Sequence, residues 1–381
     1  MDFEITDEQK AIYSVAQEFG ESQIAPFARK WEEEGTIPKS LWKEMQGLGF
    51  GGICSSEQFG GTGLNRTDSI LVYEALARSC PSVAAFLSIH NMGSWMIDNF
   101  GNDELKNKYL PKVNQLECLV SYCLTEPGSG SDASALKSKA KINNGHWVLD
   151  GTKSFISGGN YSDAYIVMCR TGSEKAKGIS AIIVDANSQG LSFGANENKM
   201  GWRSQPTSEL RFEECIVPQL NLLGEIGKGF KYAMMGLDTG RLNIAACSLG
   251  GAQKTFDQSV AYIGTRKAFG KTLDQFQALQ FQIADMKTAL ETSRQLLRFA
   301  AWNYDQKNSS ATKYCAMAKQ YVTDTCWNVA NTCLQLHGGY GYLSDYGIEK
   351  IVRDLRVHQI LEGTNEIMRT IIFRETMREY Q

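Results

Sequence analysis

A single carboxylate stands in a tight turn near the end of this 381-residue chain. Glu362 follows the apolar pair Ile360-Leu361 and precedes Gly363, between two helical patterns. Burial beside apolar residues raises the proton affinity of a carboxylate, because it disfavours the charged form. Glycine lets the backbone approach a ligand closely. Glu362 is therefore a candidate general base, and a solvated surface carboxylate is the alternative.

Two more windows combine polar groups with flexible backbone. Residues 125–132 follow a predicted strand and fit G-x-G-x-x-A at Gly128, Gly130 and Ala133. That dinucleotide fingerprint requires a helix and a second strand; more β structure follows here, so we reject an NAD site. Residues 155–157 offer an aromatic face for a flat cofactor and a hydroxyl for its edge, although core packing is the simpler explanation of this window alone.

Cations and glycines mark two windows near predicted helix ends. Residues 266–271, Arg-Lys-Ala-Phe-Gly-Lys, place three cations near a helix start. Residues 335–341, Gln-Leu-His-Gly-Gly-Tyr-Gly, end a helix in a glycine-rich turn. Arginine suits bidentate phosphate contact. A solvated basic turn and a helix C-cap are the respective alternatives.

Composition excludes several functional classes. The net charge is −3 with no basic block, whereas phosphate binding by nucleic-acid partners needs clustered Lys and Arg. The sequence has no apolar run of 18 residues, so we expect no transmembrane helix. The four histidines have no zinc spacing, so we expect no metal. The ten cysteines contain no C-x-x-C, which favours a reduced compartment. The acidic N-terminus resembles neither a secretory signal nor a transit peptide.

Sequence periodicity predicts an α+β chain of three parts. Helical patterns fill residues 1–118, beginning with a capping box at Thr6 and Gln9. Short β-rich runs without intervening helices fill residues 119–226, with a hairpin turn at 143–145, and predict an antiparallel barrel or sandwich. Helical periodicity returns over residues 227–381 and predicts a bundle.

The chemical windows together resemble the acyl-CoA dehydrogenase family over nearly the whole chain. The resemblance is carried by residues 122–132, 266–270, 335–341 and 361–365, in family order. It implies an N-terminal helical domain, a middle β domain and a C-terminal four-helix bundle. It also implies FAD, an acyl-CoA substrate, electron-transferring flavoprotein as oxidant, and a homotetramer.

The resemblance also implies a role for each matching residue. Glu362 would remove the proton α to the thioester while the β-hydrogen leaves as hydride to flavin N5. The residues placed against FAD are Tyr122, Cys123, Leu124, Thr125, Gly128, Gly130, Ser131, Phe155, Ile156, Ser157, Arg266, Phe276, Gln277, Gln335, Leu336, His337, Gly338, Gly339, Thr364, Asn365 and Glu366. Those from 266 to 339 would act partly across a subunit boundary. The residues placed against the acyl-CoA are Ser131, Asp238, Thr239, Gly240, Arg241, Gly363 and Arg374.

Three positions depart from patterns common in the family. Many relatives carry tryptophan and threonine where this chain has Phe155 and Ser157. Isovaleryl-type and long-chain members take their base from an earlier helix, at the position of Gly240 here. Glycine cannot accept a proton, so Glu362 is left as the base, and Gly240 is expected to leave room for a branch at the substrate Cα.

Within the family, residues 88–92, 201–207 and 353–360 resemble members that act on short, α-branched acyl-CoAs, and Gly240 would leave room for such a branch. The expected reaction is oxidation of isobutyryl-CoA to methacrylyl-CoA, a step of valine catabolism. The alternatives are a straight short-chain or 2-methylbutyryl substrate, an oxidase that uses oxygen, and a non-catalytic flavin-binding scaffold. The expected compartment is the mitochondrial matrix, with the leader absent from this chain, or the cytoplasm of a bacterium.

Overall fold

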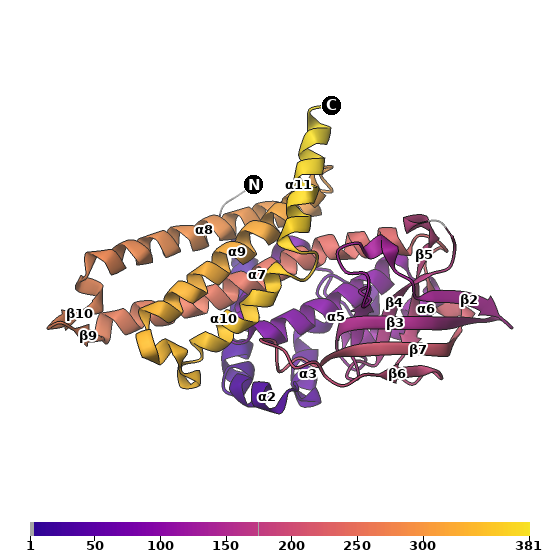
Figure 1. Ribbon diagram of the computed structural model, residues 1–381, viewed down its shortest axis with the longest axis horizontal. Helices are drawn as coiled ribbons and strands as arrows, with labels where there is room; N and C mark the ends of the chain where they lie inside the picture. Colours follow the sequence, from indigo (N-terminus) through magenta and orange to yellow (C-terminus); the bar gives the residue numbers. More distant parts are fainter. Residues whose placement is uncertain (1–3, 174) are drawn as a thin grey trace.

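The computed structural model in Figure 1 describes residues 4–173 and 175–381. Helices occupy the chain as far as Asn114. They are α1 Asp7–Phe19, η1 Gly20–Ile24, α2 Ala28–Glu34, α3 Lys39–Met45, η2 Gln46–Leu48, η3 Phe50–Gly52, η4 Glu57–Phe59, α4 Arg66–Ala77, α5 Pro81–Phe100 and α6 Asp103–Asn114. The predicted capping box begins α1, since Thr6 accepts from the Gln9 backbone and the Gln9 side chain accepts from Thr6.

Strands occupy the middle of the chain. They are β1 Val120–Cys123, β2 Lys139–Asn143, β3 His146–Ser157, β4 Ala164–Arg170, β5 Ile179–Asp185, β6 Leu191–Phe193, β7 Thr207–Pro218 and β8 Leu222–Leu223, with short helices η5 Ala133–Ala135, η6 Ala176–Gly178 and η7 Gln219–Asn221. The predicted hairpin joins β2 and β3 through Asn144 (φ 48°) and Gly145 (φ 75°).

The strands form one sheet in the order β6-β7-β3-β2-β4-β5-β8, and β1 pairs with β4. Most pairs are antiparallel as predicted, but β1 runs parallel to β4, and β2 meets β4 in parallel at one residue pair. β4 is buried on both faces. Ile166 and Met168 face a core shared with α5 and α6, whereas Tyr165 and Val167 face a core formed by strands. Helix packing therefore fixes β1 and the turn that follows it.

The last part is a helical bundle. Its elements are α7 Gly229–Thr265, β9 Lys267–Ala268, β10 Lys271–Thr272, η8 Leu273–Gln275, α8 Gln277–Asp305, α9 Ala311–Leu336, η9 Gly338–Tyr342, η10 Ser344–Tyr346, α10 Ile348–Arg356, η11 Val357–Gln359 and α11 Asn365–Glu379. α7, α8 and α9 pack side by side, and α11 projects from the body (Figure 1). None of the helices in the described ranges is long and apolar enough to cross a membrane.

Candidate active site

Glu362 lies in a strained turn between η11 and α11. Its φ is 57° and that of Gly363 is 86°, so two successive residues adopt the left-handed conformation. This conformation is uncommon for a residue such as glutamate and persists only where the surroundings enforce it. Thr364 then caps α11, because its hydroxyl accepts from the backbone of Ile367 at 3.3 Å.

Two buried cations hold the carbonyl groups of this turn. Arg241 Nε of α7 donates to the Glu362 carbonyl at 3.2 Å. Lys319 Nζ of α9 donates to the Gly363 carbonyl at 2.8 Å. Each contact pins one of the two left-handed residues, so α7 and α9 together impose the turn.

The Glu362 carboxyl lies directly against Gly240 of α7. A Cβ atom at position 240 would be 2.6 Å from Glu362 Oε2 and 2.8 Å from its Cδ. The space beside Gly240 is therefore filled by the carboxyl itself. The close approach of the carboxyl explains the glycine at this position, and room for a substrate branch beside it stays a prediction.

The carboxyl has the environment of a base that works near neutral pH. Burial raises the pKa of Glu362 to about 7, although Arg241 and Lys319 oppose the rise. Glu362 Oε2 is enclosed and has no hydrogen-bond partner among the described residues. The buried Tyr122 hydroxyl of β1 also has no hydrogen-bond partner among the described residues. Burial raises the pKa of Tyr122, and the nearby Glu362 charge adds a smaller rise. Buried polar atoms are almost always paired, so these two orphans indicate where a ligand would supply partners.

Gly240→Ala should displace the Glu362 carboxyl. The added methyl would meet the carboxyl closer than real Cβ contacts allow, and displacement of a catalytic group by about 1 Å costs roughly 10²-fold in rate. We expect stopped-flow flavin reduction to slow by about that factor. Gly264→Ala is the matched control, because it lies on the same helix with no described atom within 4 Å of an added Cβ. Equal rates in the two variants would contradict the contact.

The side chains predicted to touch substrate from α7 are engaged internally. Arg241 Nη1 forms an ion pair with Asp238 at 2.6 Å, and Asp238 also accepts from Thr312 at 2.7 Å. The Thr239 hydroxyl is buried and donates to the Gly236 carbonyl. Arg241 and its partner Asp238 therefore support the Glu362 turn, whereas the Thr239 bond lies within α7. Arg374 is exposed and pairs with the neighbouring Glu375.

The turn after β1 presents open backbone. Added Cβ atoms at Gly128 and Gly130 would meet no described atom within 4 Å, and Ser131 is exposed. A buried ion pair holds this turn from below. Glu126 accepts from Lys153 Nζ at 2.8 Å and from the backbone of residues 137 and 138. Lys153 also donates to the Leu124 carbonyl at 3.0 Å.

Phe155 sits where the β3–β7 pairing slips. The register shifts between Lys153 and Ile156, and Phe155 adopts φ 57°. β-bulges often re-aim a side chain beside a functional site. The ring is 67% exposed, so it can cover a flat ligand as the sequence predicts. Ser157 follows, half-buried, with its carbonyl held by Ser121 at 2.6 Å.

The cationic window, residues 266–271, begins directly after the C-terminal end of α7. Arg266, with residues 336–340 and neighbours, lines a surface pocket of about 490 Å³, and its guanidinium lies 5.3 Å from the Tyr340 ring centre. α7 runs unbroken from Gly240 to the residue before Arg266. At 1.5 Å per residue the two are about 39 Å apart, beyond the reach of one FAD. The structure therefore does not bring the two predicted parts of the cofactor site together within one chain.

Several predicted cofactor residues are enclosed. Cys123, Ile156 and Asn365 are buried. Phe276 and Gln277 begin α8, and Gln335 and Glu366 are exposed. Sequence reasoning missed Lys319 and Lys153. The available signal for Lys319 was a lysine on an apolar face, with Cys315 one turn before it and Val322 one turn after it.

Comparison with known proteins identifies the family. Residues 6–117, 121–215 and 227–377 match the N-terminal, middle and C-terminal domains described as acyl-CoA dehydrogenase. The chain belongs to the acyl-CoA dehydrogenase family. This acyl-CoA dehydrogenase is 49% identical, over 98% of its length and 90% of the relative, to "Isobutyryl-CoA dehydrogenase, mitochondrial" of Dictyostelium discoideum.

Two solved structures share the complete fold of this acyl-CoA dehydrogenase. Butyryl-CoA dehydrogenase from Megasphaera elsdenii superposes with a TM-score of 0.96 at 36% identity, covering 99% of this chain and 100% of the other. PigA, solved with FAD and proline, superposes with a TM-score of 0.95 at 28% identity, covering 99% of each chain. The three-part fold is therefore confirmed.

The cofactor of an acyl-CoA dehydrogenase is FAD, and the residues of this chain fit it. The open backbone at Gly128 and Gly130 and the exposed Phe155 ring suit a flat ring system. The orphaned Tyr122 hydroxyl and Glu362 Oε2 mark buried polar positions beside it. The pocket at Arg266 combines a guanidinium with glycine backbone, which suits a pyrophosphate.

Proposed function

We propose that this enzyme oxidises isobutyryl-CoA to methacrylyl-CoA in valine catabolism, with Glu362 as the base that removes the α-proton. The observation that carries the proposal is the Glu362 carboxyl, whose Oε2 is enclosed with no partner among the described residues and whose pKa burial raises to about 7. The identity to the Dictyostelium protein supports a branched short-chain substrate. FAD, when bound, supplies the acceptor for the β-hydrogen.

The chain's own residues supply three parts of the chemistry. The Glu362 carboxylate takes the α-proton, and a base placed in this way contributes about 10²–10⁴-fold. None of the described hydrogen bonds uses the backbone N–H of Glu362, which leaves it free to polarise the thioester carbonyl as charge develops. Burial keeps water from the carboxyl and strengthens both effects.

A substrate panel tests the acyl group. We expect kcat/KM of the FAD-loaded enzyme to be highest for isobutyryl-CoA, ahead of 2-methylbutyryl-, butyryl- and isovaleryl-CoA. One methylene in an apolar pocket changes kcat/KM by about 10–200-fold, so the order is measurable. A preference for butyryl-CoA would overturn the substrate assignment. Peroxide formed under air without an electron acceptor would instead identify an oxidase.

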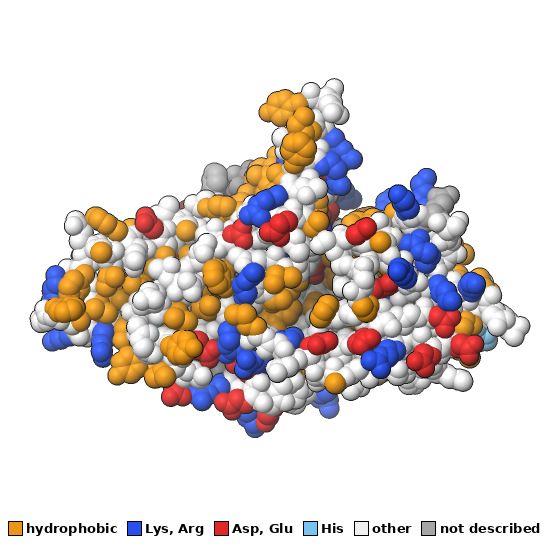
Figure 2. All heavy atoms as spheres, in the orientation of Figure 1, with side chains coloured by type: hydrophobic (Ala, Val, Ile, Leu, Met, Phe, Trp, Pro, Cys, Tyr) orange, Lys and Arg blue, Asp and Glu red, His pale blue; other side chains and the backbone are white. Residues whose placement is uncertain are grey.

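Assembly and electron acceptor complete the proposal. The separation of about 39 Å along α7 between Gly240, which lies against Glu362, and Arg266 supports a homotetramer in which one subunit contributes Arg266 and residues 335–339 to the FAD of its neighbour. Exposed apolar side chains on the projecting α11 (Figure 2) and Phe269 at the β9–β10 tip, 95% exposed, support such contacts. Electron-transferring flavoprotein is the proposed oxidant. The proposed compartment is the mitochondrial matrix of a eukaryote or the cytoplasm of a bacterium.

A further inference from the structure

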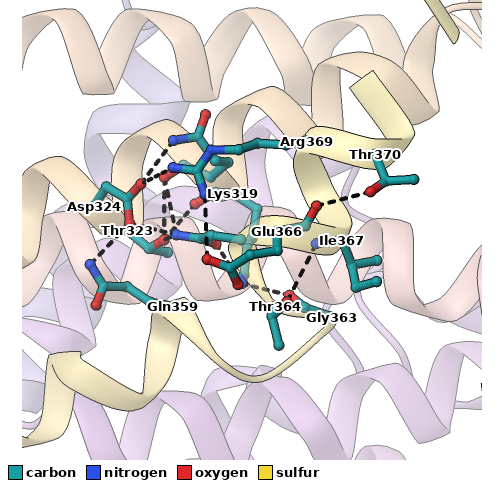
Figure 3. A network of polar contacts seen from close by, with 12 residues as sticks. Lys319, Thr323, Asp324, Gln359, Gly363, Thr364, Glu366, Ile367, Arg369 and Thr370 are labelled. Carbon is teal, nitrogen blue, oxygen red and sulfur yellow. Dashed lines mark hydrogen bonds and ion pairs between the residues drawn. The ribbon is translucent and has the colours of Figure 1, made fainter. Parts of the chain in front are cut away.

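Residues of α9 accept hydrogen bonds from both ends of the turn that carries Glu362 (Figure 3). Before the turn, Gln359 Nε2 donates to Asp324 Oδ1 at 3.0 Å. After the turn, Asn365 Nδ2 donates to the same oxygen at 2.7 Å. A single carboxylate oxygen therefore fixes the separation of the two ends.

Lys319 lies five residues before Asp324 on α9 and holds the interior of the same loop. Its ammonium donates to the Gly363 carbonyl and to Asn365 Oδ1, each at 2.8 Å. Lys319 is fully enclosed. A buried ammonium is costly unless hydrogen-bonded, so these two bonds fix its position. Residues 359, 363 and 365 of this loop are thus each hydrogen-bonded to α9.

We propose that Lys319 is a positioning residue for Glu362. Its bonds fix the Gly363 carbonyl, and with it the left-handed turn and the direction in which the Glu362 carboxyl and backbone N–H point. Its charge also acts on the carboxyl that it positions. The inference rests on the proposed function in taking Glu362 as the base.

The ionisable groups around the turn decide how its charge responds to pH. They are Arg241 and Asp238 of α7, Lys319 and Asp324 of α9, Tyr122 of β1, His358 of η11, and Glu366 and Arg369 of α11. Arg241 and Lys319 act to lower the pKa of Glu362. Burial lowers the pKa of His358 to about 3, so this ring stays neutral near pH 7. Burial also lowers the pKa of Lys319.

Two substitutions separate the hydrogen bond from the charge. Lys319→Gln keeps a donor that can reach the Gly363 carbonyl but removes the charge, whereas Lys319→Met removes both. Lys313→Met is the matched control on the same helix, because Lys313 is buried and pairs with Glu379 away from the turn. Each purified holoenzyme is assayed for flavin reduction across pH. The protonation of Glu362 is followed independently by infrared titration, with the band assigned by its loss in Glu362→Gln.

We expect both Lys319 variants to move the acid limb of kcat/KM and the infrared titration about one unit to higher pH, as removal of a nearby opposite charge does. Lys319→Met should also lose about 10–100-fold in kcat, because the base is no longer aimed, whereas Lys319→Gln should keep most of it. An acid limb and a kcat equal to those of Lys313→Met would overturn the proposal. A shifted infrared titration with an unshifted rate profile would instead show that Glu362 is not the base. If Lys319→Met does not fold, Lys319→Gln alone decides through its titration.

Discussion

Glu362→Gln should retain FAD and lose flavin reduction by substrate. Glutamine is nearly isosteric with glutamate but cannot accept the α-proton at neutral pH. The loss should be at least the 10²–10⁴-fold that a positioned base contributes. Burial raises the pKa of Glu362, so the amide removes a group that is costly to ionise, and the fold should persist. Stopped-flow absorbance at saturating isobutyryl-CoA measures the rate, and the flavin-to-protein ratio measures retention.

The pH profile supplies the control. The carboxyl must be deprotonated to act, so kcat/KM of the parent should rise with pH through about 7 and fall as pH drops below it. The residual rate of Glu362→Gln should show no such limb. Glu44→Gln is the matched variant, because Glu44 is an exposed carboxylate on α3 with no assigned part in the site, and its rate and profile should follow the parent. A Glu362→Gln variant that reduced flavin at the parental rate would refute the base assignment.

Local sequence signals predicted most of the fold and the desolvated turn that holds Glu362. Glu362 was recognisable because an apolar pair before it and a glycine after it already imply a desolvated turn. The hairpin at residues 143–145 was predicted because Asn and Gly tolerate the left-handed conformations that its turn requires. Met286 and Leu290 are buried, as the helical period over α8 predicts.

Features that depend on distant partners were not predictable from local signals. Lys319 is 44 residues from Gly363 and Lys153 is 27 residues from Glu126, and a buried lysine has the same letter as an exposed one. The sequence predicts short β-rich runs, but residues 207–218 form one long strand, β7, because pairing with β3 carries it through register shifts. The parallel pairing of β1 with β4 likewise depends on a neighbour 44 positions away.

The second large prediction concerns stability and the buried ion pair of Lys153 and Glu126, which holds the turn after β1. The side chain of Lys153 is 0% exposed and that of Glu126 is 7% exposed. Lys153→Met leaves the Glu126 carboxylate buried without its cation, and breaking such a pair costs about 3–5 kcal/mol. We expect the free energy of unfolding, from urea titration of the holoenzyme, to fall by about that amount. The affinity for FAD should fall as well, because Lys153 also holds the Leu124 carbonyl within the turn.

The double variant Lys153→Met/Glu126→Gln identifies the cause. If the unpaired carboxylate is responsible, removing its charge should restore part of the stability, so the double variant should unfold less readily than Lys153→Met alone. Lys141→Met, at an exposed lysine on β2, is the control and should lie within about 0.5 kcal/mol of the parent. Although burial opposes it, Lys153 lowers the pKa of Glu126 below 4.5. In Lys153→Met burial acts on Glu126 without its cation and raises the pKa of this carboxyl above 4.5, so the deficit should shrink as the pH falls through that raised pKa and Glu126 takes up a proton. A deficit that stays constant on acidification would show that lost packing, and not the unpaired charge, destabilises the turn.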